Sequence, residues 1–217
     1  MMAMERLKVN PAKVNERPFY HVVKRLFDIV ASACGLILLS PLFLFLVIKI
    51  RSEDGGPAFY SQERIGKNEK PFKMWKFRSM IVDADKMLDK LEDQNEIDGA
   101  MFKIKDDPRV TKIGHVIRKY SLDELPQLWN VLIGDMSLVG PRPPLPSEVE
   151  EYTNYDKQRL TVVPGCTGLW QVTKRNEADF DEMVWLDIVY INHSGAWEDL
   201  KLIIKTVLVM VHPNGAY

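Results

Sequence analysis

The sequence predicts a mostly helical α+β fold with a membrane-associated segment near the N-terminus. Three observations support this prediction: an apolar run at residues 29–48, two strand-like stretches at residues 58–61 and 72–77, and a helical hydrophobic stripe at residues 200–211. Of the 217 residues, 46% are hydrophobic and 27% are charged. This composition supports a packed core and excludes a fully disordered chain.

Charge and cysteine content narrow the class of partner and the compartment. The net charge of −1 argues against a general nucleic-acid-binding protein. Residues 1–51 nevertheless hold eight Lys or Arg against three Asp or Glu, so we expect this part to meet an anionic surface, with residues 1–20 as a basic arm or an interfacial helix. Cys34 and Cys166 form no CxxC motif, which favours a reducing location facing the cytoplasm.

The apolar run at residues 29–48 has the length of a membrane element. Twenty helical residues at about 1.5 Å each would cover roughly 30 Å, the thickness of the hydrocarbon core of a bilayer. Ser40-Pro41 lies near its middle and should kink or break the helix, and Asp28 at its edge is expected to pair with a neighbouring cation. Positive charge flanks the run on both sides, at Lys24, Arg25, Lys49 and Arg51. The residues alone leave a kinked full span, favoured because spans are commoner, and a re-entrant helix that returns to the cytoplasmic side.

Further elements follow from local patterns. The prolines between residues 141 and 146 predict an extended turn after Gly140. The stripe at residues 200–211 predicts a helix that packs on the core or lies on the membrane surface. Residues 79–96 are expected to form a helix whose apolar side consists of Met80, Met87, Leu88 and Leu91.

The clearest candidate for chemistry is an acidic pair at residues 123 and 124. Ser121 and Glu124 have the spacing of a capping box, which predicts that a helix opens here with Asp123 and Glu124 at its N-terminus. Such acids commonly only complement the helix dipole. Two adjacent carboxylates can also hold Mg²⁺ together with substrate phosphates, and this use requires cations nearby.

Basic residues that could meet a phosphate lie in segments rich in turn residues. Arginine binds phosphate oxygens with a planar fork, so several arginines could clamp a diphosphate, although each alone is more often a solvated surface charge. No P-loop and no GxGxxG motif is present, so neither common nucleotide-binding motif is supported. The candidates are Arg64, Lys76, Arg78, Arg109, Arg118, Arg142, Arg159 and Arg175.

Eight short strings, taken in order along residues 20–217, carry a family resemblance. They are Lys24–Asp28 with Ser40-Pro41, then residues 62–66, 76–80, 107–111, 117–118 with 121–127, 138–143, 164–172 and 187–190. Each string is weak alone, but eight in register are specific. The chain resembles the bacterial sugar transferase family, the monotopic polyprenyl-phosphate phosphoglycosyl transferases.

The resemblance implies a reaction and roles for the candidate residues. The family moves a sugar 1-phosphate from a UDP-sugar to polyprenyl (undecaprenyl) phosphate and releases UMP, the initiating step of exopolysaccharide, capsule, O-antigen or glycoprotein glycan synthesis. By resemblance, Asp123 is the nucleophile that forms an aspartyl-phosphosugar, and Glu124 assists it through Mg²⁺ or as a base. Arg118 and Arg142 are the first candidates for phosphate contacts. The lower-ranked candidates for phosphate contacts are Arg175, Lys76, Arg78, Arg64 and Arg109.

The resemblance also implies a membrane arrangement. It replaces the full span by a re-entrant helix broken at Ser40-Pro41, with Lys24, Arg25 and Asp28 as part of the anchor. The expected organisation is an arm at residues 1–20, the anchor at 21–51 and a catalytic domain at 52–217, on the cytoplasmic face of the bacterial inner membrane. The implied partners are the UDP-sugar, undecaprenyl phosphate, the lipid bilayer and downstream glycosyltransferases, with a homodimer left open. The alternatives are a non-catalytic, membrane-anchored scaffold of polysaccharide assembly and a soluble globular protein in which the run at residues 29–48 is part of the core.

Overall fold

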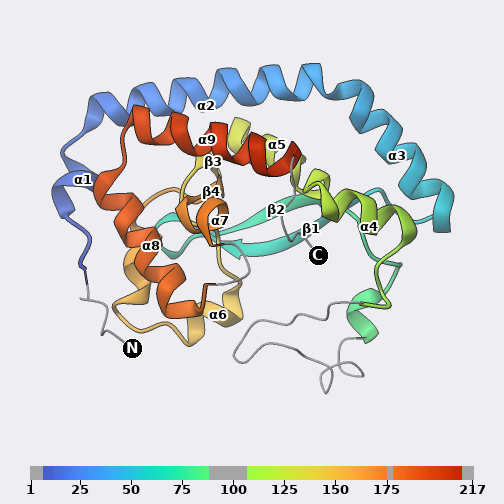
Figure 1. Cartoon of the computed structure of the whole chain (residues 1–217). Helices are drawn as coiled ribbons and strands as arrows, with labels where there is room; N and C mark the ends of the chain where they lie inside the picture. The colour runs from blue at the N-terminus through green and yellow to red at the C-terminus, as the bar shows by residue number, and fades with distance from the viewer. Residues whose placement is uncertain (1–6, 88–106, 175–177, 212–217) are drawn as a thin grey trace.

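Two consecutive helices, α2 (Pro18–Leu38) and α3 (Ser40–Asp54), arch over one side of the molecule in the computed structural model (Figure 1). The structure describes residues 7–87, 107–174 and 178–211. The two helices meet at Leu39 and are bent by 59°. Pro41 lies in the first turn of α3, where its missing N–H cannot continue the ladder of α2, and the Ser40 hydroxyl donates to the carbonyl of Ile37 at 2.7 Å. The predicted break at Ser40-Pro41 is confirmed.

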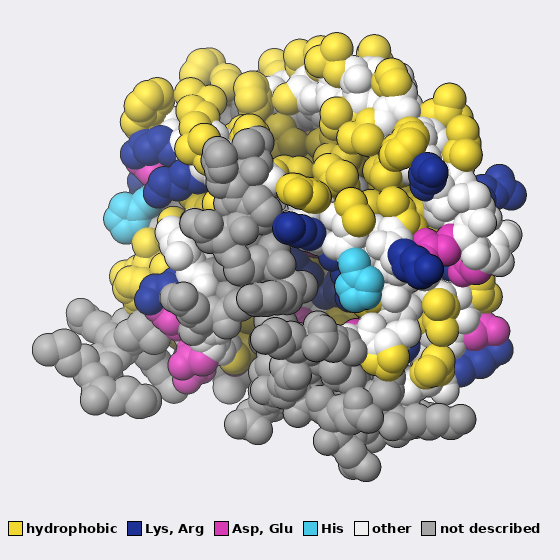
Figure 2. Space-filling model, turned by 45° about the vertical axis from the view of Figure 1, so that its right-hand side comes forward, with side chains coloured by type: hydrophobic (Ala, Val, Ile, Leu, Met, Phe, Trp, Pro, Cys, Tyr) yellow, Lys and Arg dark blue, Asp and Glu magenta, His cyan; other side chains and the backbone are white. Residues whose placement is uncertain are grey.

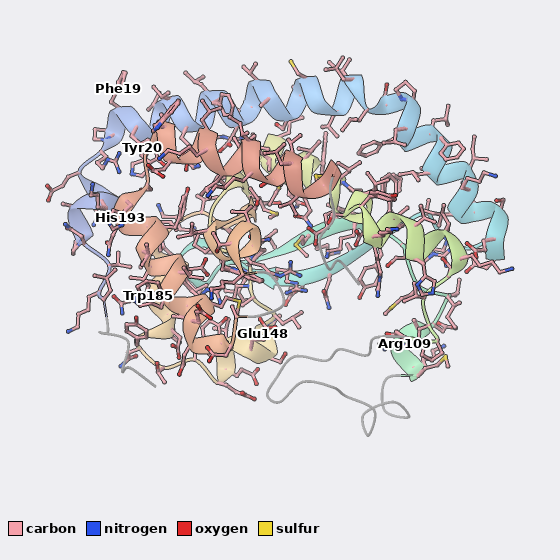
Figure 3. The ribbon with its side chains drawn as sticks, in the orientation of Figure 1. Phe19, Tyr20, Arg109, Glu148, Trp185 and His193 are labelled. Atoms are coloured by element: carbon pink, nitrogen blue, oxygen red, sulfur yellow. The ribbon has the colours of Figure 1, made fainter. Side chains whose placement is uncertain are left out.

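The bent pair α2–α3 is also the membrane candidate of the described chain. Within the described residues, no single helix has the length and apolarity needed to cross a bilayer, whereas α2 and α3 meet those criteria together. Exposed apolar side chains follow α2, including Phe19, which is 82% exposed and points away from the body (Figure 3). Figure 2 shows hydrophobic side chains gathered over the upper part of the molecule.

The segment before α2 is partly helical. Helix α1 (Pro11–Asn15) begins after Asn10, whose side chain accepts a hydrogen bond from the Ala12 amide. Because α2 already begins at Pro18 and α3 ends at Asp54, the expected boundaries after residues 20 and 51 fall inside helices.

Two small sheets form the β structure. Strands β1 (Phe59–Ile65) and β2 (Pro71–Phe77) pair antiparallel, with Phe59 opposite Phe77, which confirms the two predicted strands. The 3₁₀ turn η1 (Lys67–Glu69) connects them. Strands β3 (Ser137–Val139) and β4 (Gly165–Thr167) form a parallel pair that the sequence analysis did not predict.

The extended proline segment after Gly140 is confirmed, and it connects β3 with β4 through two short helical elements. These elements are α6 (Pro146–Glu150) and the 3₁₀ helix η5 (Asp156–Thr161). Where the two parallel strands lie side by side, a Cβ on Gly165 would lie 2.0 Å from the Gly140 nitrogen, so only glycine permits this close approach.

Helices surround the two sheets and bury three clusters of core residues. α4 (Lys112–Lys119) packs with α3 and the β1–β2 hairpin around Ile117 and Phe77. α8 (Phe180–His193) and α9 (Ala196–Val211) pack with β3 around Val139 and Ile191. α5 (Gln127–Ile133) lies against α2 and β2. α9 confirms the helix predicted from the stripe at residues 200–211, and Figure 1 shows it beneath α2. The observed mostly helical α+β class is the predicted one.

The helix predicted to begin at residue 79 does not begin there. Met80 instead forms an isolated antiparallel bridge with Val110, and the Ser79 carbonyl accepts from the Thr111 amide at 3.0 Å. Asp83 has a positive φ of 62°, and only a 3₁₀ turn, η2 (Ala84–Met87), follows. The prediction failed because the chain uses these backbone groups for long-range pairing. Residues 88–96 of the predicted helix lie outside the described residues.

Polar contacts fix α2 to the rest of the fold, in a pattern that differs from the expected one. Asp28 is buried, and its Oδ1 accepts from the Leu138 amide at 3.0 Å. Its expected pairing with Lys24 or Arg25 is wrong, because Lys24 binds Asp199 at 2.8 Å and Arg25 donates to two carbonyls at the end of α5. The last carbonyls of a helix have no intrahelical donor, so they are suitable acceptors for a guanidinium.

Candidate active site

Asp123 and Glu124 lie on η4 (Leu122–Glu124), a 3₁₀ turn between α4 and α5. The predicted capping box is wrong: Ser121 has a left-handed backbone with φ of 54°, and its side chain makes no cap hydrogen bond. The next α-helix begins only at Gln127, after Pro126. The Glu124 side chain contacts a lysine instead of capping the backbone. Because only a 3₁₀ turn stands here, the acidic pair lies on a tight corner rather than on a regular helix.

A cavity of about 560 Å³ opens over this corner. Part of its lining is polar and includes the acidic pair and three basic side chains, and part is apolar, with α9 as the largest contributor. The polar lining residues include Lys76, Arg118, Ser121, Asp123, Glu124, Arg142, Thr167, Gln171 and Thr206. The apolar ones include Leu125, Leu128, Leu138, Val172, Ile203, Val207 and Met210. Such a cavity suits a ligand with a highly charged group joined to an apolar part.

Glu124 is held ionised by neighbouring cations. Its Oε1 lies 2.9 Å from the Lys76 Nζ on β2 and 3.7 Å from an Arg142 nitrogen in the proline segment. Burial opposes ionisation, but Lys76, Arg142 and Arg64 outweigh it and hold the pKa of Glu124 below its usual value. These cations therefore favour the ionised form of Glu124.

In Asp123 the effects of burial and of neighbouring charges on the pKa balance the other way. Burial and the adjacent Glu124 charge raise its pKa to about 6, although Lys76 and Arg118 lower it. Arg118, at the end of α4, is positioned by a hydrogen bond from its Nε to the Ser79 hydroxyl at 2.9 Å. Asp123 is thus the more basic of the two carboxylates and shares the cavity lining with two cations that act on it electrostatically, which suits a carboxylate that reacts at an anionic centre.

Four further arginines expected at phosphate do not line this cavity, and one of them, Arg159, is buried in an ion pair with Asp187. Arg78 pairs with Asp54 at the end of α3, and Arg109 pairs with Asp107 at the edge of the molecule (Figure 3). Arg64 is buried and donates to the Pro143 carbonyl at 3.1 Å, next to Arg142. Arg64 therefore supports the proline segment and adds positive potential behind Glu124. Arg175 lies outside the described residues.

Comparison with known proteins identifies the family. Residues 19–213 match the family model described as bacterial sugar transferase. The chain belongs to this family.

Named relatives of this sugar transferase differ in length. The chain is 50% identical over 196 residues to the galactosyl transferase CpsE of Streptococcus agalactiae. It is 45% identical over 216 residues to the undecaprenyl-phosphate galactose phosphotransferase of Salmonella typhimurium. These alignments cover 90% and 98% of this chain but only 43% and 44% of the relatives, so the chain spans less than half their length. The exopolysaccharide production protein ExoY of Rhizobium meliloti is 40% identical over 205 residues, which is 93% of this chain and 91% of ExoY.

The site of this sugar transferase includes polar residues to which sequence reasoning gave no role. Trp170 and Gln171 on α7 (Leu169–Thr173) line the cavity, and the Trp170 Nε1 and the Gln171 Oε1 are buried without a hydrogen-bond partner among the described residues. The Gln171 amide is oriented by its Nε2, which donates to the Cys166 carbonyl at 3.3 Å. Their string at residues 164–172 belonged to the family resemblance, and that was the only signal that could have identified them.

The acidic pair is compatible with a magnesium ion. Among the described residues no group of three or more His, Cys, Asp or Glu side chains could hold a metal. Mg²⁺ nevertheless binds in many phosphate-handling enzymes through one or two carboxylates plus substrate oxygens and water. Asp123 and Glu124 are adjacent, and both line the cavity, so they fit that donor set.

Proposed function

We propose that this bacterial sugar transferase transfers a sugar 1-phosphate from a UDP-sugar to undecaprenyl phosphate, giving undecaprenyl-diphospho-sugar and UMP. The observation that carries the proposal is the cavity in which Asp123 and Glu124 lie among Lys76, Arg118 and Arg142. The names of relatives such as undecaprenyl-phosphate galactose phosphotransferase agree with it.

In the first step, the Asp123 carboxylate attacks the phosphorus that carries the sugar. A bond forms between an Asp123 Oδ and this phosphorus, the bond to the bridging oxygen breaks, and UMP leaves with that oxygen and its electron pair. The product is an aspartyl-phosphosugar. Arg118 and Arg142 bind the phosphate oxygens and reduce the repulsion between the anionic diphosphate and the carboxylate.

Glu124 and magnesium have supporting roles in this proposal. Asp123 and Glu124 would hold Mg²⁺, which supplies positive charge that polarises phosphoryl oxygens and stabilises a leaving phosphate. Glu124 also fixes Lys76 at 2.9 Å, so that this ammonium stays beside Asp123 and favours its ionised form.

In the second step, an oxygen of undecaprenyl phosphate attacks the same phosphorus and the Asp123 carboxylate leaves, which restores the enzyme. The acceptor joins a phosphate to a long hydrocarbon chain. The apolar side of the cavity, with Leu128, Ile203 and Val207, is suited to the first isoprene units, while the basic residues bind the phosphate.

The bent pair α2–α3 is the proposed anchor. We propose that it is re-entrant on the cytoplasmic face of the inner membrane, because basic residues flank both ends of its apolar run at residues 29–48 and exposed apolar side chains such as Phe19 and Leu38 lie along it. This arrangement would hold the carboxylate pair at headgroup depth, where a water-soluble donor and a lipid acceptor can meet. The product would then initiate a glycan that downstream glycosyltransferases extend.

The reaction is tested by measuring UMP release from a panel of UDP-sugars in the presence of a short polyprenyl phosphate. We expect release with one or a few sugars, loss on chelation and recovery with added Mg²⁺. Metal binding is followed separately by the electron paramagnetic resonance of Mn²⁺, which should bind the wild type and bind more weakly to Glu124→Gln. A protein that stays membrane-bound but releases no UMP with any UDP-sugar would instead support the scaffold alternative.

A further inference from the structure

A second cavity, of about 190 Å³, lies beneath the first turns of α2. It is enclosed by α1, α2, α8 and the segment around β3, and none of its described lining residues also lines the cavity over Asp123. Its volume is several times the ~15 Å³ that a single water needs. No step of the proposed transfer reaction uses it.

The charged side chains in the otherwise largely apolar lining of this second cavity are predominantly basic. Its basic side chains, apart from His21, are Lys13, Lys24, Arg25 and Lys67. Asp28 is the one acidic residue among the described lining residues, and its carboxylate accepts a hydrogen bond from the Leu138 amide. Two of the cations are occupied, because Lys24 binds Asp199 and Arg25 donates to carbonyls of α5. The remaining two set the electrostatic character of the cavity.

Lys13 and Lys67 are these two cations, and neither ammonium has an ion-pair or hydrogen-bond partner among the described residues. Lys13 is half-buried on α1, where a charge without a counter-ion carries a desolvation cost. The buried Ser137 hydroxyl, also in the lining, has no hydrogen-bond partner among the described residues either. Two ammonium groups and a hydroxyl are a donor set for a phosphate, which accepts several charge-assisted hydrogen bonds.

We propose that this cavity binds a phosphate group through Lys13 and Lys67, with Ser137 as a further donor. The phosphodiester of an anionic lipid and free phosphate share the required chemistry. The site lies next to Tyr20, whose neighbour Phe19 points outward on the exposed apolar side of α2 (Figure 3). A lipid phosphate at that depth would reach the cavity from the bilayer surface. The site is distinct from the proposed transfer site, and its existence does not depend on that reaction.

Calorimetry on the full chain in a zwitterionic detergent tests this site with three probes. They are inorganic phosphate, dihexanoyl phosphatidylglycerol and, as the zwitterionic control, dihexanoyl phosphatidylcholine. Lys13→Gln and Lys67→Gln each remove one proposed contact. Lys8→Gln removes an equal charge from an exposed position of the same N-terminal segment that does not line the cavity. Arg142→Met separates this cavity from the one over Asp123.

We expect the dissociation constant of phosphatidylglycerol or of inorganic phosphate to rise about fivefold in Lys13→Gln and in Lys67→Gln, and to stay unchanged in Lys8→Gln and Arg142→Met. Tighter binding of phosphatidylglycerol than of inorganic phosphate identifies a lipid as the source, and the reverse identifies free phosphate. The proposal is overturned if neither anion binds, if Lys8→Gln weakens binding as much as Lys13→Gln, or if Arg142→Met alone abolishes it.

Discussion

Arg142 at the cavity and Arg78 beneath α3 are both arginines beside a carboxylate, but their surroundings differ. The Arg78 side chain is 8% exposed, and its guanidinium donates to both carboxylate oxygens of Asp54 and to two backbone carbonyls. The Arg142 side chain is 36% exposed, lies 3.7 Å from Glu124 and makes no side-chain hydrogen bond to another described residue. An arginine whose donors are occupied holds the fold together, whereas one whose donors remain available beside an acidic pair can bind a phosphate.

The largest expected effect concerns the acidic pair. Asp123→Asn should lower the rate of UMP release by about 10⁴-fold or more, because it removes the proposed nucleophile while keeping the size and shape of the side chain. Initial rates with the preferred UDP-sugar give this ratio, and thermal unfolding monitored by circular dichroism checks that the fold persists. Appreciable UMP release by folded Asp123→Asn would exclude the assigned role.

The next effect separates the two arginines by activity. Arg142→Met should lower kcat/KM by about 10²- to 10³-fold, the usual cost of removing one donor to a transition-state oxyanion. Its melting temperature should stay close to that of the wild type, since no described side-chain hydrogen bond is lost. Steady-state kinetics of UMP release provide the measurement, and an unchanged kcat/KM would contradict the proposed phosphate contact.

Arg78→Met is the matched control and should show the reverse pattern. Asp54 would lose its bidentate partner, so the free energy of unfolding should fall by about 1.5–3 kcal/mol, while kcat/KM per folded molecule is unchanged. Urea denaturation measures the loss. Because Arg78 holds the pKa of Asp54 at about 2, this stabilisation is present above the usual carboxyl pKa and fades as the pH falls toward 2. Equal stability of variant and wild type at neutral pH would refute the assignment.

The smallest effect is a pH dependence specific to the cavity. Because burial raises the pKa of Asp123 to about 6, the reactive carboxylate is protonated below that pH, and kcat/KM should fall about tenfold for each further pH unit. Lys76→Met should shift this acidic limb to higher pH, since Lys76 lowers the pKa of Asp123. A pH–rate profile that is flat between 4 and about 7, or a limb unmoved by Lys76→Met, would argue against Asp123 as the titrating group.

Local rules were enough to predict part of this structure. The break at Ser40-Pro41 follows from the missing proline donor, and α9 follows from a 3.6-residue stripe. The family motifs named Asp123, Glu124, Lys76, Arg118 and Arg142, and the structure brings these five side chains to one cavity. Their chemical roles stay predictions.

Long-range contacts explain the parts that the sequence did not predict. Met80 pairs with Val110 instead of continuing a helix, and the β3–β4 pair depends on the close approach of Gly140 and Gly165. Arg78 and Arg142 cannot be told apart by residue type, because what separates them is the Asp54 carboxylate at the end of α3. Such partners are fixed by tertiary structure and leave no local pattern.

The covalent step is the central claim, and the most direct measurement omits the lipid acceptor. The protein is mixed with a UDP-sugar labelled at the sugar, UMP is measured during the first turnover, and the mass of the intact protein is determined. We predict a burst of UMP equal to the active sites, a mass increase of one phosphosugar and no label on Asp123→Asn. UMP release that strictly requires polyprenyl phosphate, or label that persists in Asp123→Asn, would contradict an aspartyl intermediate at this position.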